Sequence, residues 1–329
     1  MLTLFRTNQA SAGLLLFLYA LLLQLPAWLG GGAAYVAAEY TGGGALGEWS
    51  ARWMNGRVVL NYLLPVVLLT LQGIVANVLV TRHRMGRKIT QFPGLFLILT
   101  WALVPALRTY HPAQPAGLFV LLALLALARV YKNPHPATPL FNAGAWLGLA
   151  ILFVPAAVVL LPAFAVGIGL LRRPDTRSVL QLLIGTLVIL FLAAAGYYFF
   201  GGLGAAVASQ LAGLGWVRWP EVGVAQVFGL ALAGLLLLLS IVNQGSIVRL
   251  LGIEGSKVVS ILYWVLFFAG AGYFLSGATG LGYLQLVTLV PGVALGLWFN
   301  DLAPGRAEFL HLLLFVAAIG AVVYPFYLA

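Results

Sequence analysis

Charged residues are scarce in this sequence: they make up 7% of its 329 residues, whereas apolar residues make up 63%. A soluble domain usually carries about 25% charged residues. A chain with so few cannot cover a globule with polar surface, so we infer that lipid is its main solvent. Runs of about 20 apolar residues, the length that crosses a bilayer as a helix, recur from end to end. Strands of a membrane barrel would need alternating polar positions, which are missing. The sequence therefore predicts an all-α, polytopic membrane helical bundle.

Cysteine is absent, which excludes disulfides, thiolate metal sites, cysteine nucleophiles and iron–sulfur clusters. Ionisable residues are also missing from the middle of every predicted span. The acidic residues all fall in predicted loops or at helix ends: Glu39, Glu48, Asp175, Glu221, Glu254, Asp301 and Glu308. Ion-coupled transport needs titratable groups at depth, so a conventional ion-coupled transporter is disfavoured.

Cofactor sites find no support either. The lysines and histidines lie in loops or near span ends, which leaves no retinal Schiff base and no axial ligands for a membrane haem. Glu308 and His311 form half of a di-iron motif, but a second copy and further glutamates are lacking. We interpret this pair as polar residues at a helix end, and we predict no metal and no cofactor.

Eleven spans follow from the apolar runs. They lie near residues 13–34, 58–80, 91–107, 116–130, 141–154, 156–171, 179–200, 222–242, 258–275, 281–299 and 309–327. The runs 141–154 and 156–171 are short and meet at Pro155. About eleven helices are therefore expected to cross the membrane, or ten if 141–171 is re-entrant. With the N-terminus in the cytoplasm, 13 of the 17 Lys and Arg residues lie in inner segments and 4 in outer ones, as the positive-inside rule expects.

The loops are too short for a soluble domain, so residues 1–329 are predicted to form a single transmembrane domain. The first apolar run resembles a signal peptide but has no small-x-small cleavage site, and we expect it to be retained as a helix. The net charge of +10 is explained by the inner loops, and nucleic acid is not an expected partner. Asn and Gln within spans are expected mainly to bond between helices.

The outer surface is the candidate site. Two polar, glycine-containing intervals, 35–57 and 201–221, lie there. Arginine binds phosphate through its planar fork, and aromatic rings stack on sugars or sit at headgroup depth. Glu48 and Glu221 are the candidate general bases. The candidate substrate-binding residues are Arg52, Arg57, Arg108, Arg218, Asn61, Trp53 and His111.

A purely structural interpretation of these residues stays open. Trp and Tyr belts mark any membrane interface. Glu48 and Arg52 have the spacing of an ordinary helical ion pair, and Trp49 and Trp53 fit a helix lying on lipid. Arg57 has no carboxylate nearby in the sequence, which makes it a stronger candidate than Arg52.

The inner loops carry two dense basic segments, 81–88 and 170–177. We interpret them mainly as orientation signals, with binding of anionic lipid or of a cytoplasmic partner as the alternative. Residues 243–257 are predicted to form a short interfacial helix with Ile247, Leu250, Leu251 and Ile253 towards lipid.

Several segments resemble an uncharacterised family, a domain of unknown function, of polytopic inner-membrane proteins from Bacteroidota. They are LFRTNQ at 4–9, FNAGAWLGLAILFVPA at 141–156, RSVLQLLIGTLVILFLAAAGYYF at 177–199 and GVALGLWFNDLAPGRAEFLHLLLF at 292–315. The family often has an acidic residue where this chain has Ser178. The resemblance implies location in the inner membrane and a role in the cell envelope, but no activity.

Three functions follow as hypotheses. The first is a polytopic inner-membrane subunit or assembly factor of a cell-envelope system, with membrane lipids and envelope proteins as partners. The second is an outer-leaflet enzyme or carrier handling polyprenyl-phosphate-linked glycan or lipid, by analogy with glycan polymerases and ligases. The third is an uncoupled transporter or lipid flippase. Whether the protein is an enzyme stays open.

Overall fold

The computed structural model describes residues 2–6, 12–29, 43–173, 175–217, 223–249, 251–277 and 280–327. Its α-helices are α1 (Ala12–Leu29), α2 (Ala45–Met54), α3 (Val58–Arg82), α4 (Phe92–Ala102), α5 (Ala113–Ala128), α6 (Ala137–Phe153), α7 (Leu160–Leu171), α8 (Thr176–Phe199), α9 (Leu203–Ala212), α10 (Val224–Val242), α11 (Gln244–Arg249), α12 (Ile253–Phe274), α13 (Leu284–Asp301) and α14 (Pro304–Tyr327). Four 3-10 turns are η1 (Leu2–Phe5), η2 (Pro105–Leu107), η3 (Pro155–Val159) and η4 (Gly280–Tyr283). In these residues the only β pairing is an isolated bridge between Gly215 and Ser276, so the all-helical prediction is confirmed.

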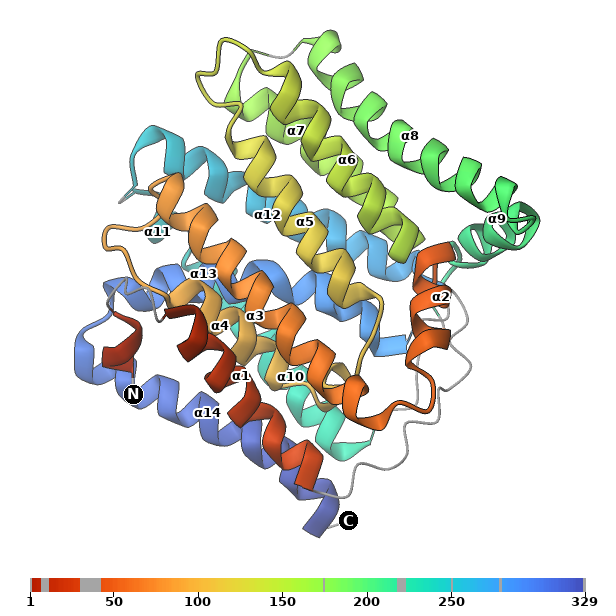
Figure 1. The fold of residues 1–329 in the computed structure, drawn as a ribbon. Coiled ribbons are helices and arrows are strands. Elements are labelled where there is room, and N and C mark those ends of the chain that lie inside the picture. Colours follow the sequence, from red (N-terminus) through yellow and green to blue (C-terminus); the bar gives the residue numbers. More distant parts are fainter. Residues whose placement is uncertain are drawn as a thin grey trace.

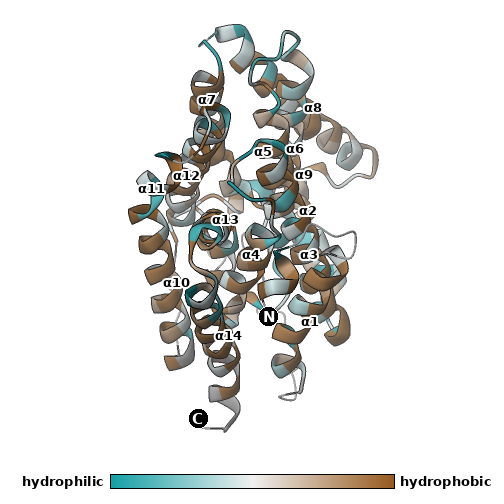
Figure 2. Ribbon diagram, turned by 90° about the vertical axis from the view of Figure 1, so that its left-hand side faces the viewer, coloured by the Kyte–Doolittle hydropathy of each residue, from teal (hydrophilic) through white to brown (hydrophobic). Residues whose placement is uncertain are grey.

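Six helical segments of the described chain are long and apolar enough to cross a membrane. They are Val58–Arg82, Thr176–Phe199, Gln226–Arg249, Ile253–Phe274, Leu281–Asp301 and Pro304–Ala321. Figure 2 shows hydrophobic residues along most of α10 and α14, and hydrophilic residues mainly near helix ends and connections. These apolar helices indicate a membrane protein.

The centre of the bundle is α4, which packs against α13 and α3 (Figure 1). All 11 residues of α4 are buried. The predicted span 91–107 is therefore a short core helix followed by a separate turn. The helix ends because Val104 is extended before Pro105, as residues preceding proline usually are. At about 1.5 Å per residue, α4 is near half the thickness of a bilayer core.

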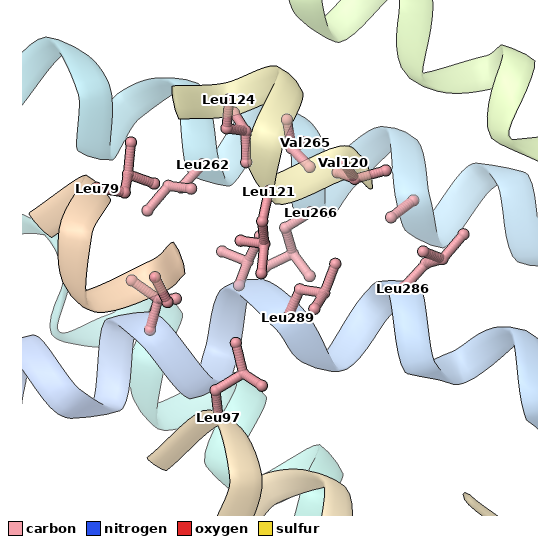
Figure 3. Close-up of a cluster of buried hydrophobic side chains, with 14 of the residues drawn as sticks. Leu79, Leu97, Val120, Leu121, Leu124, Leu262, Val265, Leu266, Leu286 and Leu289 are labelled. Carbon is pink, nitrogen blue, oxygen red and sulfur yellow. The ribbon is translucent and has the colours of Figure 1, made fainter. Parts of the chain in front are cut away.

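Leucine and valine side chains from five helices close the space beside α4 (Figure 3). Leu121 of α5 lies among Leu262 and Leu266 of α12 and Leu289 of α13 in this view. Leu97 of α4 approaches the same cluster. This apolar cluster joins α3, α4 and α5 to α12 and α13.

Helices α6 and α8 pack backbone to backbone. A Cβ at Gly144 would overlap with the carbonyl oxygen of Leu182, and a Cβ at Gly185 would overlap with that of Phe141. Thr186 Oγ1 donates to the carbonyl oxygen of Gly144 at 3.0 Å. Small residues at such crossings let helices approach closely in lipid. Much of the other surface of α8 is exposed, and α8 lies along one edge of the bundle (Figure 1).

The predicted inner segments come together at one end of the bundle, which we call the basic end. Gln91 N donates to the carbonyl oxygen of Phe5 at 2.9 Å. Asn300 Nδ2 donates to the carbonyl oxygen of Lys88 at 2.9 Å. His83 Nδ1 lies 2.8 Å from Glu254 Oε1. These contacts link the loops around η1, α3–α4, α12 and α13.

Residues 137–171 reverse direction at η3, which begins at Pro155; α6 packs mainly on α5 and α8, whereas α7 packs mainly on α12. The start of α6 and the end of α7 lie together at the basic end, because Ala137 and Arg172 line one cleft there. Near residue 250 the short helix is shorter than predicted, covering Gln244–Arg249. Ile247 is buried in the bundle, which corrects its predicted direction towards lipid, whereas Ile253 is exposed at the start of α12.

Polar residues at depth bond between helices. Asn77 Nδ2 donates to Gln91 Oε1 at 2.5 Å, and Asn77 Oδ1 accepts from Gly94 N at 2.8 Å. Gln72 Nε2 donates to the carbonyl oxygen of Gln114 at 2.6 Å. These bonds join α3 to α4 and to the start of α5, as expected for Asn and Gln within spans.

Candidate functional site

Helix α2 carries several of the predicted site residues. Arg52 Nη2 lies 3.4 Å from Glu48 Oε2, and the Arg52 side chain is 76% exposed. Ser209 Oγ of α9 donates to the same Glu48 oxygen at 2.6 Å. Trp49 and Trp53 are both exposed. The helix therefore turns its tryptophans outward and uses Glu48 to hold α9, a contact that joins the two polar intervals of the sequence.

Arg57 and Asn61 lie in different environments although they are four residues apart. Arg57 is exposed at the start of α3, and its guanidinium carbon lies 4.4 Å from the centre of the Trp53 ring. A cation over an aromatic ring is attracted to it. Asn61 is fully buried and donates to the carbonyl oxygen of Met54 at 3.1 Å. Asn61 thus fixes the turn between α2 and α3.

Arg108 is buried, not on the outer surface where it was predicted. Its Nη1 donates to the carbonyl oxygen of Leu23, and its Nη2 donates to that of Ala318 at 2.7 Å. Its Nε and Nη2 donate to the carbonyl oxygen of Ala102 at 3.1 and 2.6 Å. Burial lowers the pKa of Arg108 to about 9, so the side chain is charged at neutral pH. Arg108 therefore ties α1, α4 and α14 together, with four of its five N–H groups already used.

His111 is also buried, at the start of α5. Its Nδ1 accepts from the backbone N of Ala113 at 3.0 Å. A Cβ at Gly282 would overlap with the imidazole ring, so the turn η4 closes directly over it. Two other candidates, Arg218 and Glu221, lie outside the described residues. The described arginines and Glu48 therefore do not converge on one cavity.

A cavity of about 310 Å³ lies next to Glu48, between α2, α6, η3, α8 and α9. Its lining is almost wholly apolar: Ala45, Ile151, Leu152, Pro155, Val158, Leu190, Ala193, Ala194, Tyr197, Leu203, Ala206, Val207, Gln210, Leu211 and Leu214. Val207, Leu211 and Leu214 are partly exposed, so the cavity opens at the surface. We call it the α9 pocket. Its volume is near the lower limit for ligand pockets.

Gln210 is the side-chain amide that lines the α9 pocket. Among the described residues it is the one side-chain amide whose nitrogen and oxygen are both buried without a hydrogen-bond partner. Leaving such groups unpaired costs about 1–3 kcal/mol each. Gln210 follows Ser209, whose hydroxyl contacts Glu48. An amphiphilic ligand would place its chain along the apolar wall and its polar part at Gln210.

Two glycines of the α2 segment make the pocket possible. A Cβ at Gly44 would overlap with the carbonyl oxygen of Leu152, and one at Gly47 would overlap with that of Phe153. Gly44 N donates to the carbonyl oxygen of Phe153 at 3.1 Å. The start of α2 therefore rests on the end of α6 and closes one side of the pocket. Gly44, the last residue of the glycine run before α2, serves this close approach.

Sequence reasoning missed α9 because glycines flank it and the interval was interpreted as a loop. The signal was nevertheless present: residues 203, 206, 207, 210, 211 and 214 have helical spacing, and all six line the pocket. Five of the six are apolar and one is Gln210. A polar residue within an apolar helical face is the feature that would have indicated a site.

No group of three or more His, Cys, Asp or Glu side chains in the described part of the chain could hold a metal ion. Glu308 accepts from Leu2 N at 3.2 Å, and His311 Nε2 lies 3.0 Å from the Tyr19 hydroxyl. Comparisons with profiles of protein families, with characterised proteins and with solved structures found no match. The function must therefore be argued from the geometry alone.

Proposed function

We propose that the protein is a multi-pass membrane protein that binds one lipid-like molecule in the α9 pocket. The observation that carries this proposal is Gln210, a buried and unpaired amide in an otherwise apolar pocket. In the proposed topology about eleven helices cross the bacterial inner membrane and the N-terminus is cytoplasmic. The α9 pocket then lies on the non-cytoplasmic side, with α2 at the interface.

An apolar wall alone would not select a ligand from a bilayer. Lipid tails are about as apolar as leucine, so moving a chain from the membrane into the pocket gains little from the hydrophobic effect. Selectivity must therefore come from polar groups. The pocket offers Gln210 within it, while Ser209, Glu48 and Arg52 lie beside it. The expected ligand is a single hydrocarbon or isoprenoid chain whose polar part forms hydrogen bonds with an amide.

The geometry supports binding, and no observation assigns a bond-breaking step. Glu48 stays the candidate base for an enzyme acting on lipid-linked glycan, but its Oε2 already accepts from Ser209 and pairs with Arg52. An alternative role as an envelope subunit would need a protein partner. The exposed apolar surfaces of α8 and α10 are explained by lipid alone, so binding of a lipid-like ligand is the function we develop.

The test is the substitution Gln210→Leu. The amide has no hydrogen-bond partner when no ligand is bound, so replacing it with leucine removes the cost of burying an unpaired polar group. We therefore expect the free energy of unfolding of the delipidated variant to exceed that of the delipidated wild type by about 1 kcal/mol. The same change removes the group that selects the ligand, so the occupancy of co-purified lipid falls severalfold. Native mass spectrometry counts the retained molecules, and unfolding in detergent micelles measures stability.

Two tryptophan variants separate this site from general lipid contact. Val207→Trp narrows the pocket, and we expect it to abolish retention of the bound molecule. Leu187→Trp adds the same ring to an exposed position of α8 outside the pocket and should retain wild-type occupancy. Equal occupancy in the wild type, Gln210→Leu and Val207→Trp would show that the pocket holds no ligand.

A further inference from the structure

A second cleft lies at the basic end, where α7 stops and α8 starts. Its volume is about 360 Å³. Its lining is mostly polar: Pro134, His135, Pro136, Ala137, Arg172, Asp175, Arg177, Ser178 and Gln181. It shares no residue with the α9 pocket and lies near the opposite end of α8.

The cleft has a net positive charge, and its arginine side chains are not fully paired with acceptors. Arg172 and Arg177 line it, with one carboxylate, Asp175. Asp175 Oδ1 accepts from Arg177 N at 3.2 Å as the cap of α8. Within the described chain, Asp175 forms no salt bridge with either arginine. Arg172 Nη1 is buried and has no hydrogen-bond partner. A buried cationic donor without an acceptor is unfavourable, and an anion bound in the cleft would supply that acceptor.

The rest of the lining suits a tetrahedral anion. Ser178 is buried in the first turn of α8, and Gln181 follows one turn later. The first turn of α8 adds its positive dipole end to the same space, while the N–H groups of Arg177, Ser178 and Val179 donate to Asp175. The cleft also adjoins the first residue of a helix long enough to span, which places it at headgroup depth in a membrane.

We propose that this cleft binds a phosphate group, held by the forked guanidinium groups of Arg172 and Arg177 and by the start of α8. Arginine forks match phosphate oxygens in pairs. The phosphate belongs either to an anionic lipid of the surrounding leaflet or to a soluble phosphorylated molecule, since the recognising chemistry is the same. The basic segment 170–177 thus has a binding role besides its contribution to orientation, independent of the α9 pocket.

The experiment measures binding of two probes to the full chain in a neutral detergent: inorganic phosphate and dihexanoyl phosphatidic acid. Arg172→Gln and Arg177→Gln should each weaken binding by about 10-fold or more, because a hydrogen bond to a charged group is lost. Arg173→Gln is the matched control. It removes the same charge from the adjacent, exposed residue, which does not line the cleft, and should change the affinity by less than about 2-fold.

The two probes identify the source of the phosphate. Binding of both shows that a free phosphate group suffices, whereas binding of phosphatidic acid alone identifies a lipid. The proposal fails if neither probe binds the wild type, or if Arg173→Gln weakens binding as much as Arg172→Gln. Arg172→Lys guards against misfolding: it keeps the charge without the fork and should bind with intermediate affinity while unfolding like the wild type.

Discussion

At the scale of single residues, arginines that look equivalent in the sequence have different roles. Arg52 and Arg57 are exposed, one beside Glu48 and one over Trp53. Arg108 is almost completely buried and bonds only to backbone carbonyl oxygens. A sequence shows that a cation follows a span, but not whether distant carbonyl groups will surround it. Arg108 was therefore predicted to bind a ligand, whereas in the structure it donates hydrogen bonds to carbonyl oxygens of α1, α4 and α14.

We predict that Arg108→Ala destabilises the protein by at least about 3 kcal/mol, because carbonyl oxygens of α1, α4 and α14 lose their charged donor. Arg108→Lys should be intermediate, since an ammonium cannot reach the same acceptors as a planar fork. Unfolding in detergent micelles measures both. Arg52→Ala, which removes an exposed ion pair, should cost less than about 1 kcal/mol. Similar losses for Arg52 and Arg108 would contradict this assignment.

At the scale of elements, the long apolar runs could be predicted closely, whereas the length of α4 and the presence of α9 could not. The spans at 58–80 and 281–299 correspond to α3 and α13 within a few residues. Helix α4 was predicted too long and α9 was not predicted, because both depend on tertiary contacts: α4 is surrounded by neighbours, and α9 is held by Glu48 of α2. The residues of the candidate site could likewise be predicted only where they do not depend on tertiary packing. Glu48 was identified from its charge, whereas Gln210 depends on how α9 packs.

Two glycines of α8 allow a matched test of its packing on α6. We predict that Gly185→Ala destabilises the protein by about 1–3 kcal/mol, because its Cβ would overlap with the Phe141 carbonyl oxygen. Gly196→Ala has open space around the new Cβ and should stabilise α8 by up to about 1 kcal/mol. Thermal unfolding of both variants checks the difference in sign. A gain of stability in both variants would mean that helix propensity, and not the α6 contact, governs position 185.

At the scale of the whole molecule, the bundle has two unlike ends. The basic end carries the phosphate cleft, and the other end carries α2 and the α9 pocket. The distribution of Lys and Arg along the chain predicted which loops share an end, because loops between successive spans alternate sides. The apolar composition likewise predicted the membrane class. The charge distribution and the composition are both sums over many residues, so neither prediction depends on any single contact.

Cysteine labelling tests the proposed orientation, since the native chain has no cysteine and gives no background. Asn55→Cys lies after α2 and Ala303→Cys lies between α13 and α14; both positions are exposed. In right-side-out membrane vesicles, a membrane-impermeant maleimide should label Asn55→Cys at once. It should label Ala303→Cys only after the vesicles are permeabilised. The reverse pattern would place the N-terminus outside.

The bond from Arg108 to Ala318 has a consequence for biosynthesis. The two residues are 210 positions apart, which corresponds to roughly 10–40 s of translation at ordinary ribosome speeds. During that interval Arg108 is already inserted, while its partner on α14 has not been made. Helix α14 thus supplies the last carbonyl acceptor for the guanidinium group of Arg108, which lies in the first third of the chain. A ribosome that stalls before α14 leaves the buried guanidinium of Arg108 without one of its carbonyl acceptors.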